Sequence, residues 1–433
     1  MVGYAIAVGA VVTMGLWLRH GGIGAISGRG SLPTAIGQVT ALIGTYAMLV
    51  QILLMSRIAW LERGIGLDRL AVWHRWLGFA TVWLITGHVV FTTIGYARGD
   101  RVSLWAQSRD FISHYPDVLI AWIGFLLLVL VAVVSMRAAR RRMRRETWYF
   151  IHLGAYLAVV LSFAHQLAVG SDLDGDRAAR VWWVGLYVLV FGAILLWRVL
   201  VPAVANARHG LRVRSVHQEA PGVVSITLTG RRVMALGAEP GQFFLWRFLT
   251  RDGWWKAHPF SLSAAPRKNS LRITVKDLGD DTRRMQSIRP GTRVIVEGPY
   301  GTFTAARRAS RRILLVAGGI GITPLRALLD AFAPPDDVVL LYRIAKPEDA
   351  VFGSELRMFA DLPNVRIHII AGNEIGDDQT DYLSIPALQQ GVPDIATREC
   401  FVCGPPALIT AMRSRLARLG VPRARVHFER FEL

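Results

Sequence analysis

The stretch Ala71–Gly95, AVWHRWLGFATVWLITGHVVFTTIG, decides the fold of this chain because it is long and apolar enough to cross a bilayer. It nevertheless carries two histidines, His74 and His88, fourteen residues apart. On a helix they lie roughly 21 Å apart along the axis and within about 40° of each other around it. Ionisable groups at membrane depth are costly and usually functional, so the pair predicts two stacked sites on one helix face.

A second apolar stretch, RETWYFIHLGAYLAVVLSFAHQLAVG, carries His152 and His165, thirteen residues apart. Four histidines on two helices predict two b-type haems with two histidine axial ligands each, which favours electron transfer over dioxygen binding at the metal. Zinc is the main alternative, but nearby cysteine or carboxylate ligands are missing. Thirteen residues of ideal helix rotate His165 about 140° from His152. Either that helix is distorted or it presents its ligands from different sides.

The first half of the chain contains six apolar runs, each with roughly the 17–25 residues that a spanning helix needs. A signal peptide is the alternative for the first run, but no lysine or arginine precedes it and no clear cleavage site follows. The sequence therefore predicts a six-helix transmembrane bundle. The runs are Val2–Leu18, Ala35–Met55, Ala71–Gly95, Val118–Met136, Trp148–Val169 and Val181–Val201.

Charges in the loops indicate the orientation, because cytoplasmic loops carry an excess of lysine and arginine. Arg137–Arg145, RAARRRMRR, is expected on the cytoplasmic side, with the three arginines of the second-to-third loop. The fifth-to-sixth loop balances three aspartates against two arginines and fits the outside. Both termini then face the cytoplasm of a plasma (inner) membrane. His74 and His152 share the inner leaflet. His88 and His165 share the outer leaflet.

The composition argues against several other classes of protein. The 433 residues are 52% hydrophobic with a net charge of +19, which in a soluble protein would suggest nucleic-acid binding. No recognisable nucleic-acid module is present, and much of the basic excess lies in short membrane loops. Two cysteines are too few for a disulfide framework or a chain-ligated iron–sulfur cluster. Electrons must therefore travel on haem or on an organic cofactor.

The second half reads as two soluble domains after a short linker, Pro202–Gly210. Alternating strands bounded by glycine and proline predict a small antiparallel barrel over Leu211–Thr304. After Arg311 strands alternate with helices, which predicts an open, Rossmann-like parallel α/β sheet.

A glycine-rich turn, GGIGITP, lies between a strand and a helix of the expected α/β sheet. Its glycines let the backbone approach a pyrophosphate, and the helix N-terminus favours negative charge. A second turn, CGPP, ends a later strand of the same sheet, and ligands bind at the carboxyl ends of such strands. Cys400 and Cys403 read as two small buried residues rather than a redox pair, but Cys403 is also a candidate to face a nicotinamide. The candidate residues are Gly318, Gly319, Gly321, Thr323, Pro324, Cys403, Gly404 and Pro405.

The barrel carries a third motif, HPFSLS, in which Phe260 could line a flavin site and Ser261 could hydrogen-bond the isoalloxazine edge. Downstream, VKDLGDDT places Thr282 at an expected helix start, where its hydroxyl is a suitable pyrophosphate donor. Each segment taken alone is also an ordinary strand or turn. The candidate flavin residues are His258, Pro259, Phe260, Ser261, Lys276, Gly279 and Thr282.

Together these residues resemble the NADPH oxidase and ferric reductase superfamily, in a bacterial form. HPFSLSAAP is similar to its flavin signature, and GGIGITP and CGPP are similar to nicotinamide signatures that it shares with ferredoxin–NADP reductase-like proteins. The histidine spacings also resemble those of its haem helices. The resemblance implies a transmembrane haem domain over residues 1–203, an FAD-binding barrel over 204–306 and an NAD(P)-binding α/β domain over 307–433.

The resemblance further implies an oxidoreductase that carries electrons from cytoplasmic NADPH through FAD and two b-type haems to an outside acceptor. That acceptor is dioxygen, giving superoxide, or ferric iron. Arg343 could pair with the 2′-phosphate of NADPH, with NADH still possible. Phe431 is the candidate to stack on the flavin. Beyond the lipid bilayer and the acceptor, no obligate protein partner is expected.

Two departures separate the chain from dedicated superoxide generators. Thr92 stands where NADPH oxidases carry a further histidine, and the second helix has no arginine before its cytoplasmic end. A ferric or cupric chelate reductase is therefore the nearest alternative. A quinone-linked electron-transfer component and a flavin-dependent haem sensor with little turnover are the other two.

Overall fold

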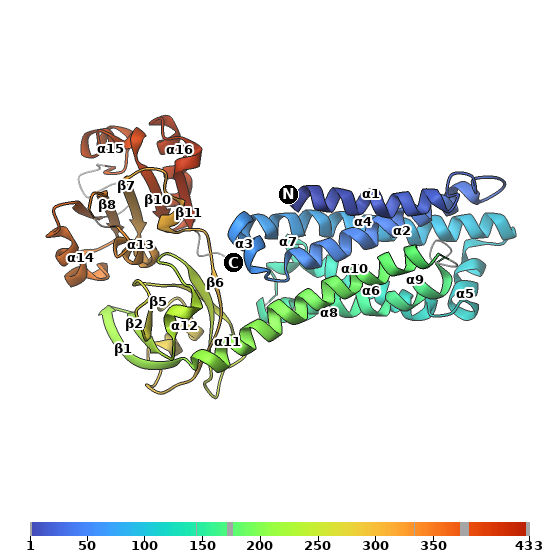
Figure 1. Ribbon diagram of the computed structural model, residues 1–433, viewed down its shortest axis with the longest axis horizontal. Helices are drawn as coiled ribbons and strands as arrows, with labels where there is room; N and C mark the ends of the chain where they lie inside the picture. The colour runs from blue at the N-terminus through green and yellow to red at the C-terminus, as the bar shows by residue number, and fades with distance from the viewer. Residues whose placement is uncertain (1, 144, 171–175, 333, 373–380, 430–433) are drawn as a thin grey trace. The chain divides into compact units, whose positions relative to one another are not determined.

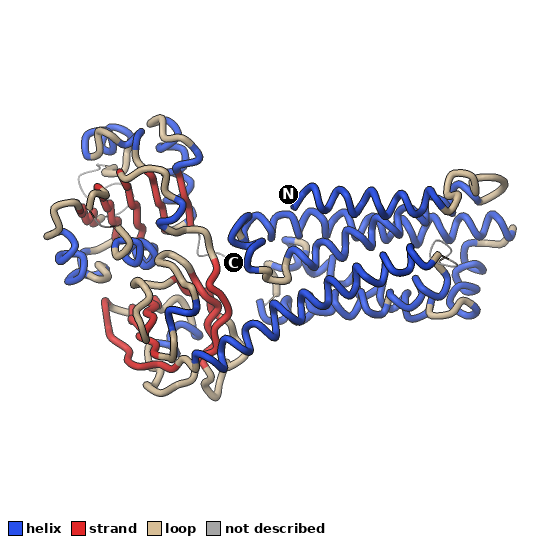
Figure 2. The backbone as a smooth tube through the Cα atoms, viewed as in Figure 1, coloured by secondary structure: helices blue, strands red, loops and turns tan. Residues whose placement is uncertain are grey.

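The computed structural model describes residues 2–143, 145–170, 176–332, 334–372 and 381–429. The chain divides into two compact units, and each is described by itself. Unit 1 holds Met1–Ile58 and Leu67–Arg198, and unit 2 holds Ala59–Gly66 and Val199–Leu433. Unit 1 is helical, whereas the strands belong to unit 2 (Figures 1 and 2).

Six helices in the described part of the chain are long and apolar enough to cross a membrane, which confirms the predicted bundle. The fifth of these spans is formed by two helices, α8 and α9, and the sixth continues beyond α10. The helices of unit 1 are α1 Val2–Arg19, α2 Ser31–Leu54, α4 Leu67–Asp100, α5 Leu104–His114, α6 Val118–Ser135, α7 Arg137–Arg140, α8 Arg145–Leu161, α9 Phe163–Val169 and α10 Arg177–Ile194.

The fifth span is interrupted at Ser162, between its two histidines. The Ser162 hydroxyl donates to the Ala158 carbonyl oxygen at 2.8 Å, a bond within the preceding turn that often bends a helix. Helix α6 approaches this point closely, since a Cβ on Gly124 would lie 2.7 Å from Ser162 Oγ. Of the two geometries left open by the thirteen-residue spacing, the structure shows the distorted helix.

Helices α2 and α4 approach each other through glycine. A Cβ on Gly37 would lie 2.4 Å from Thr92 Oγ1 and 2.9 Å from its backbone nitrogen, so a larger residue would force the helices apart. This close approach brings the backbone of α2 to the face of α4 that carries the histidines.

The predicted linker, Pro202–Gly210, is helical over most of its length. Helix α10 passes through the π-helical segment Leu195–Leu200 into α11, Val201–His209. Pro202 lies in the first turn of α11, directly after the π-helical segment, at a position where proline is tolerated best. Asn206 anchors α11 to the barrel, since its side chain donates to the Val296 carbonyl oxygen at 2.8 Å and accepts from the Val296 nitrogen at 2.8 Å.

The predicted antiparallel barrel is present. One sheet has the order β1-β2-β5 and the other the order β4-β3-β6. A bridge between Arg212 and Arg293 and another between Leu262 and Ile273 join the two sheets at both edges. The strands are β1 Arg212–Ala220, β2 Val223–Thr229, β3 Phe243–Phe248, β4 His258–Ser261, β5 Ser270–Lys276 and β6 Val294–Tyr300, and α12 covers Asp280–Met285.

The predicted α/β sheet is also present, with all neighbouring strands parallel and the order β11-β10-β7-β8-β9. The chain moves outward from β7 to one side and then returns to add β10 on the other, so the switch point lies between β7 and β10. The elements are β7 Arg312–Gly318, α13 Ile322–Leu329, β8 Asp337–Ile344, α14 Gly353–Ala360, β9 Val365–Ala371, α15 Ile385–Gly391, β10 Glu399–Cys403, α16 Pro406–Arg418 and β11 Val426–Glu429.

Candidate active site

The structure brings together the two histidines predicted to share the inner leaflet. The ring centres of His74 on α4 and His152 on α8 are 6.0 Å apart, with ring planes at 75°. Metal–imidazole bonds are about 2 Å long, so this separation leaves room for one metal ion between the two rings. His165 lies on α9. Among the described residues, no three or more His, Cys, Asp or Glu side chains form a metal-binding group.

The surroundings of the histidines fix which ring nitrogen faces the gap. His74 Nδ1 lies 3.0 Å from the Gln51 carbonyl oxygen, and His88 Nδ1 lies 3.0 Å from the Gly37 carbonyl oxygen. A carbonyl oxygen can only accept, so each Nδ1 carries the proton and each Nε2 keeps a free lone pair. Metal-ligating histidines commonly donate their other nitrogen in this way. The residues present therefore fit axial ligation of haem iron.

His152 is held by two side chains on its own side of the bundle. Its Nδ1 lies 3.2 Å from Ser135 Oγ, and its ring stacks on Trp148 at 5.0 Å between ring centres. The guanidinium carbon of Arg140 lies 4.5 Å from the Trp148 ring centre, in a cation–π contact. Ser135 is a partner that the sequence alone did not single out.

Gln166, next to His165, stabilises the interrupted helix. Its Nε2 donates to the Ser162 carbonyl oxygen at 2.7 Å, which adds a side-chain bond at the break. Its Oε1 accepts from Trp183 Nε1 at 2.7 Å and from the Tyr187 hydroxyl at 3.1 Å on α10. Gln166 is partly buried, and both its amide nitrogen and its amide oxygen have hydrogen-bond partners.

The flavin motif lies on β4, antiparallel to β3. The His258 and Phe260 rings stack at 5.9 Å with an interplanar angle of 8°, because residues two apart on a strand share a face. Trp246 Nε1 donates to the Phe260 carbonyl oxygen at 2.9 Å and fixes the strand. Ser261 is buried, and the neighbouring Pro259 is partly buried.

A cleft of about 280 Å³ opens beside His258, between the β3–β4 connection and α12. Lys256 Nζ lies 2.9 Å from both carboxylate oxygens of Asp281, and this bond holds the pKa of Asp281 below its ordinary value against the opposing effect of burial. Thr282, in the first turn of α12, donates to the Gly279 carbonyl oxygen at 3.0 Å and accepts from the Leu278 nitrogen at 2.8 Å. Its predicted pyrophosphate role stays a prediction, as do the roles of Lys276 and Gly279.

The two nicotinamide turns meet at the switch point between β7 and β10, where such sheets bind nucleotides. A Cβ on Gly321 would lie 2.3 Å from the Cys403 carbonyl oxygen, and one on Gly318 would lie 2.9 Å from Pro405 Cδ. A Cβ on Gly404 would lie 3.1 Å from the Gly318 backbone. Glycine is thus required for the turns to touch.

Gly319 differs from these neighbours. A Cβ there would meet nothing within 4 Å, yet its φ of +53° lies in the left-handed region that favours glycine. The open space beside its backbone is where a pyrophosphate could approach. Thr323 and Pro324 begin α13, and Thr323 Oγ1 donates to the Ile320 carbonyl oxygen at 2.6 Å, which closes the turn.

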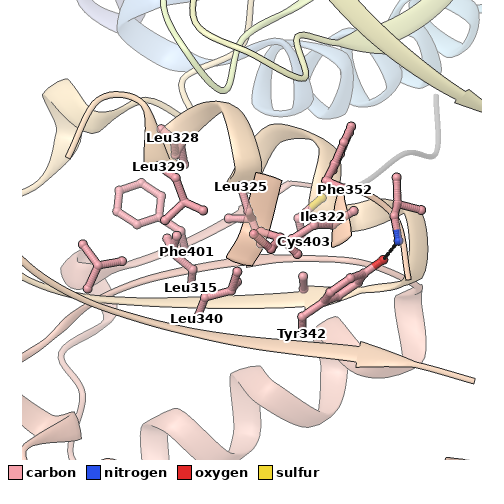
Figure 3. Close-up of a cluster of buried hydrophobic side chains, with 14 of the residues drawn as sticks. Leu315, Ile322, Leu325, Leu328, Leu329, Leu340, Tyr342, Phe352, Phe401 and Cys403 are labelled. Atoms are coloured by element: carbon pink, nitrogen blue, oxygen red, sulfur yellow. Dashed lines mark hydrogen bonds between the residues drawn. The ribbon is translucent and has the colours of Figure 1, made fainter. Parts of the chain in front are cut away.

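Both cysteines are free thiols and fully buried, on opposite faces of the sheet. This confirms two small buried residues in place of a redox pair. Cys403 packs among Ile322, Leu325 and Phe401 (Figure 3), and burial raises the pKa of its thiol well above the ordinary range. Burial raises the pKa of Cys400 to about 12. The predicted contact of Cys403 with a nicotinamide stays a prediction.

These raised pKa values predict slow thiol chemistry, since only the thiolate is reactive. With iodoacetamide at pH 8, we expect no modification of the folded protein over an hour and modification of both thiols once it is unfolded in denaturant. Mass spectrometry of the intact chain checks this result. Modification of either cysteine at the rate of the denatured chain would contradict the buried placement.

Two remaining candidates have different outcomes. Arg343 lies one residue before the end of β8, in register with Gly318, and so at the carboxyl edge that carries the glycine turn. Its predicted pairing with a 2′-phosphate stays a prediction. Phe431, the candidate to stack on the flavin, lies outside the described residues.

Three parts of the chain match known protein families. Residues 40–163 match "Ferric reductase like transmembrane component", residues 211–304 match "FAD-binding domain" and residues 315–414 match "Oxidoreductase NAD-binding domain". The matched ranges cover three of the four candidate histidines, all but His165, together with the flavin motif and both nicotinamide turns. The matches follow one another in the predicted order.

Curated relatives match the second half. A glycine betaine monooxygenase reductase subunit from Chromohalobacter salexigens is 29% identical over 239 residues, covering 52% of this chain and 65% of the relative. An NADPH oxidoreductase from Mycobacterium tuberculosis is 27% identical over 231 residues, covering 51% of this chain and 59% of the relative. The chain thus spans less than two thirds of the length of these relatives.

Solved structures are more distant. The FAD/NAD-binding domain of a nitric oxide dioxygenase from Vibrio cholerae is 24% identical, with a TM-score of 0.44 over 51% of this chain and 98% of that one. A flavohemoglobin from Malassezia yamatoensis is 16% identical, with a TM-score of 0.47 over 92% of this chain and 99% of that one.

A ferric reductase-like membrane component thus precedes an FAD-binding and an NAD-binding domain in one chain. The chain therefore has the domain arrangement of ferric reductase/NADPH oxidase-like proteins, with the FAD-binding and NAD-binding domains of an oxidoreductase following the membrane component.

Proposed function

We propose that this protein carries electrons from cytoplasmic NADPH through FAD and two b-type haems to an acceptor outside the membrane, either dioxygen or ferric iron. When bound, FAD takes a hydride and releases its electrons singly, which bis-histidine haem requires. One NADPH gives two electrons and one proton, so it reduces two one-electron acceptors and releases one proton.

The observation that carries the proposal is the His74–His152 pair. Two neutral imidazoles from different helices face each other across 6.0 Å, and the His74 ring is oriented by a backbone carbonyl behind it. Imidazole side chains at membrane depth are costly, so a metal ion that both rings ligate would explain why the two histidines lie there together. His88 and His165 would hold the second haem.

The orientation of the relay follows from charge and from the division of the chain. The arginine-rich Arg137–Arg145 loop favours the cytoplasmic side. The connection Ala59–Gly66, between the second and third spans, groups with the dehydrogenase unit. The loop charges support a cytoplasmic position for the FAD- and NAD(P)-binding domains, with His74 and His152 in the inner leaflet of the plasma (inner) membrane.

A ferric or cupric chelate reductase is the second candidate, favoured by Thr92. Its hydroxyl lies 3.2 Å from His88 Nδ1, where it shares that nitrogen with the Gly37 carbonyl oxygen. Thr92 therefore supports the histidine and offers no imidazole to an oxygen species. With both axial positions taken, either acceptor would be reduced at the edge of the outer site without binding the metal.

The deciding experiment is an absorbance spectrum of detergent-purified protein before and after NADPH under anaerobic conditions. We expect b-type haem bands, about two haems per chain by pyridine extraction, and reduction by NADPH. Bands reducible by dithionite alone would refute NADPH as the donor. A properly inserted protein without haem would refute the assignment of the four histidines. Superoxide and ferric-chelate assays on the same membranes then separate the two acceptors.

A further inference from the structure

A closed ring of hydrogen bonds joins the flavin motif to the helix that follows the glycine turn. Its members are Ser263 and Ala265 of HPFSLSAAP, Arg272 on β5, Glu355 on α14, and Arg326 and Asp330 at and beyond the end of α13. All lie within unit 2. The ring therefore connects the FAD-binding barrel with the NAD(P)-binding sheet at the two segments that carry their signatures.

The barrel side of the ring is fixed by Arg272. Its Nε donates to Ser263 Oγ at 3.1 Å and its Nη2 donates to the Ser263 carbonyl oxygen at 2.8 Å. The same guanidinium then reaches Glu355 with two bonds, at 2.5 and 3.0 Å. Such two-pronged guanidinium–carboxylate pairs fix geometry as well as contribute energy.

The sheet side is fixed by Arg326, three residues after Thr323. Its Nε donates to Glu355 Oε2 at 2.5 Å, and its Nη1 pairs with Asp330. Asp330 closes the ring by accepting from the Ala265 backbone nitrogen at 2.8 Å. The Arg326 side chain is only 8% exposed, so its charge depends on these carboxylates for compensation.

Glu355 is the member on which both sides converge. It lies in the first turn of α14, where the helix dipole favours a carboxylate. The preceding Phe352 has a φ of +63°, an unfavourable left-handed conformation for a bulky residue, and its ring lies 5.0 Å from the Arg272 guanidinium carbon. The two arginines hold the pKa of Glu355 below its ordinary value, although burial, the largest single influence, acts in the opposite direction.

We infer that Glu355 is a positioning residue for hydride transfer, holding the NAD(P)-binding lobe in register with the flavin-binding barrel through Arg272 and Arg326. The inference rests on the proposed function to the extent that hydride passes from NADPH to FAD. Glu355 touches neither cofactor motif directly. It acts through the two arginines, and hydride transfer is sensitive to the ångström-scale placement that they set.

The test is stopped-flow reduction of FAD by NADPH in the full-length, detergent-purified protein. Glu355→Gln keeps the shape but removes the carboxylate that the two guanidiniums share, leaving Arg326 with Asp330 alone. We expect the limiting rate of flavin reduction to fall about 10- to 100-fold, as misplacement by about 1 Å can do, while the Kd for NADPH changes little. Glu355→Asp retains the charge with less reach, and it should recover part of the rate.

Asp337→Asn is the matched control. Asp337 also binds two arginines, Arg398 at 2.6 Å and Arg366 at 3.1 Å, but all three belong to the NAD(P)-binding lobe. It should leave the limiting rate unchanged even where it lowers the melting temperature. An Arg272→Gln, Glu355→Gln double variant should be no slower than the slower single variant, because both substitutions break one connection.

The outcomes separate the inference from the proposed function. If NADPH fails to reduce FAD in the wild-type protein, the proposed function falls. If the wild type is active and Glu355→Gln is equally fast, or if Asp337→Asn is slowed as much, the positioning role is overturned and the electron path stands. If Glu355→Gln does not retain FAD, the Glu355→Asp rate decides, and an unchanged rate there overturns the role.

Discussion

A His88→Ala variant is expected to hold one haem in place of two and to lose electron delivery to acceptors outside the membrane. His88 is oriented by the Gly37 carbonyl oxygen and by Thr92, so its Nε2 is set to ligate the outer metal. Removing even an outer-shell partner of a metal ligand costs about 10- to 100-fold, so removing the ligand should reduce delivery by at least about a hundredfold.

The same variant should still reduce a soluble dye with NADPH, because the flavin and nicotinamide motifs belong to unit 2. Haem content is measured by pyridine extraction, and delivery is measured with ferric chelate and superoxide assays on right-side-out vesicles loaded with NADPH. His114→Ala is the matched control, since this exposed histidine at the end of α5 pairs with Asp110, outside the proposed relay. Unchanged delivery in a one-haem His88→Ala protein would refute the two-site relay.

Hydropathy and local motifs were sufficient to predict the spans, the barrel, the α/β sheet and the four histidines. Each of these signals is contained in a short window of sequence, where apolar length, alternation or a glycine turn dictates the local structure. For the fifth span the sequence predicted either a distorted helix or ligands on different sides, because thirteen residues do not complete whole turns of a helix. The Ser162 break lies between the two histidines, so the rotation expected for an ideal helix does not apply across it.

Two features could not be found in this way. Pro202 begins the stretch expected as a linker, yet it lies in the first turn of α11, where a proline costs little. Arg272 and Glu355 are 83 residues apart, and each alone reads as an ordinary surface charge. They become partners only because α14 packs against the barrel. The pattern of apolar residues in neither segment predicts that contact.

The second large effect is expected at the contact between the two nicotinamide turns. In Gly321→Ala the new Cβ would lie 2.3 Å from the Cys403 carbonyl oxygen and 2.8 Å from Gly404 Cα, so backbone must move. Overpacking typically costs about 1–3 kcal/mol, and here the displaced atoms are those that shape the pyrophosphate site. We expect reduction of FAD by NADPH to fall by about a hundredfold, as for a misplacement of about 1 Å, mainly through weaker NADPH binding.

FAD should remain bound in Gly321→Ala, because the barrel has its own core formed by residues such as Phe244, Trp246 and Ile273. Dithionite should therefore still reduce the flavin and, through it, the haems. Gly353→Ala is the matched control, since a Cβ at this helix start would meet nothing within 4 Å and its φ is ordinary. Stopped-flow traces at increasing NADPH give the limiting rate and the Kd. Wild-type values for both in Gly321→Ala would show that the two turns need not touch, and the nicotinamide site would then lie elsewhere on the sheet.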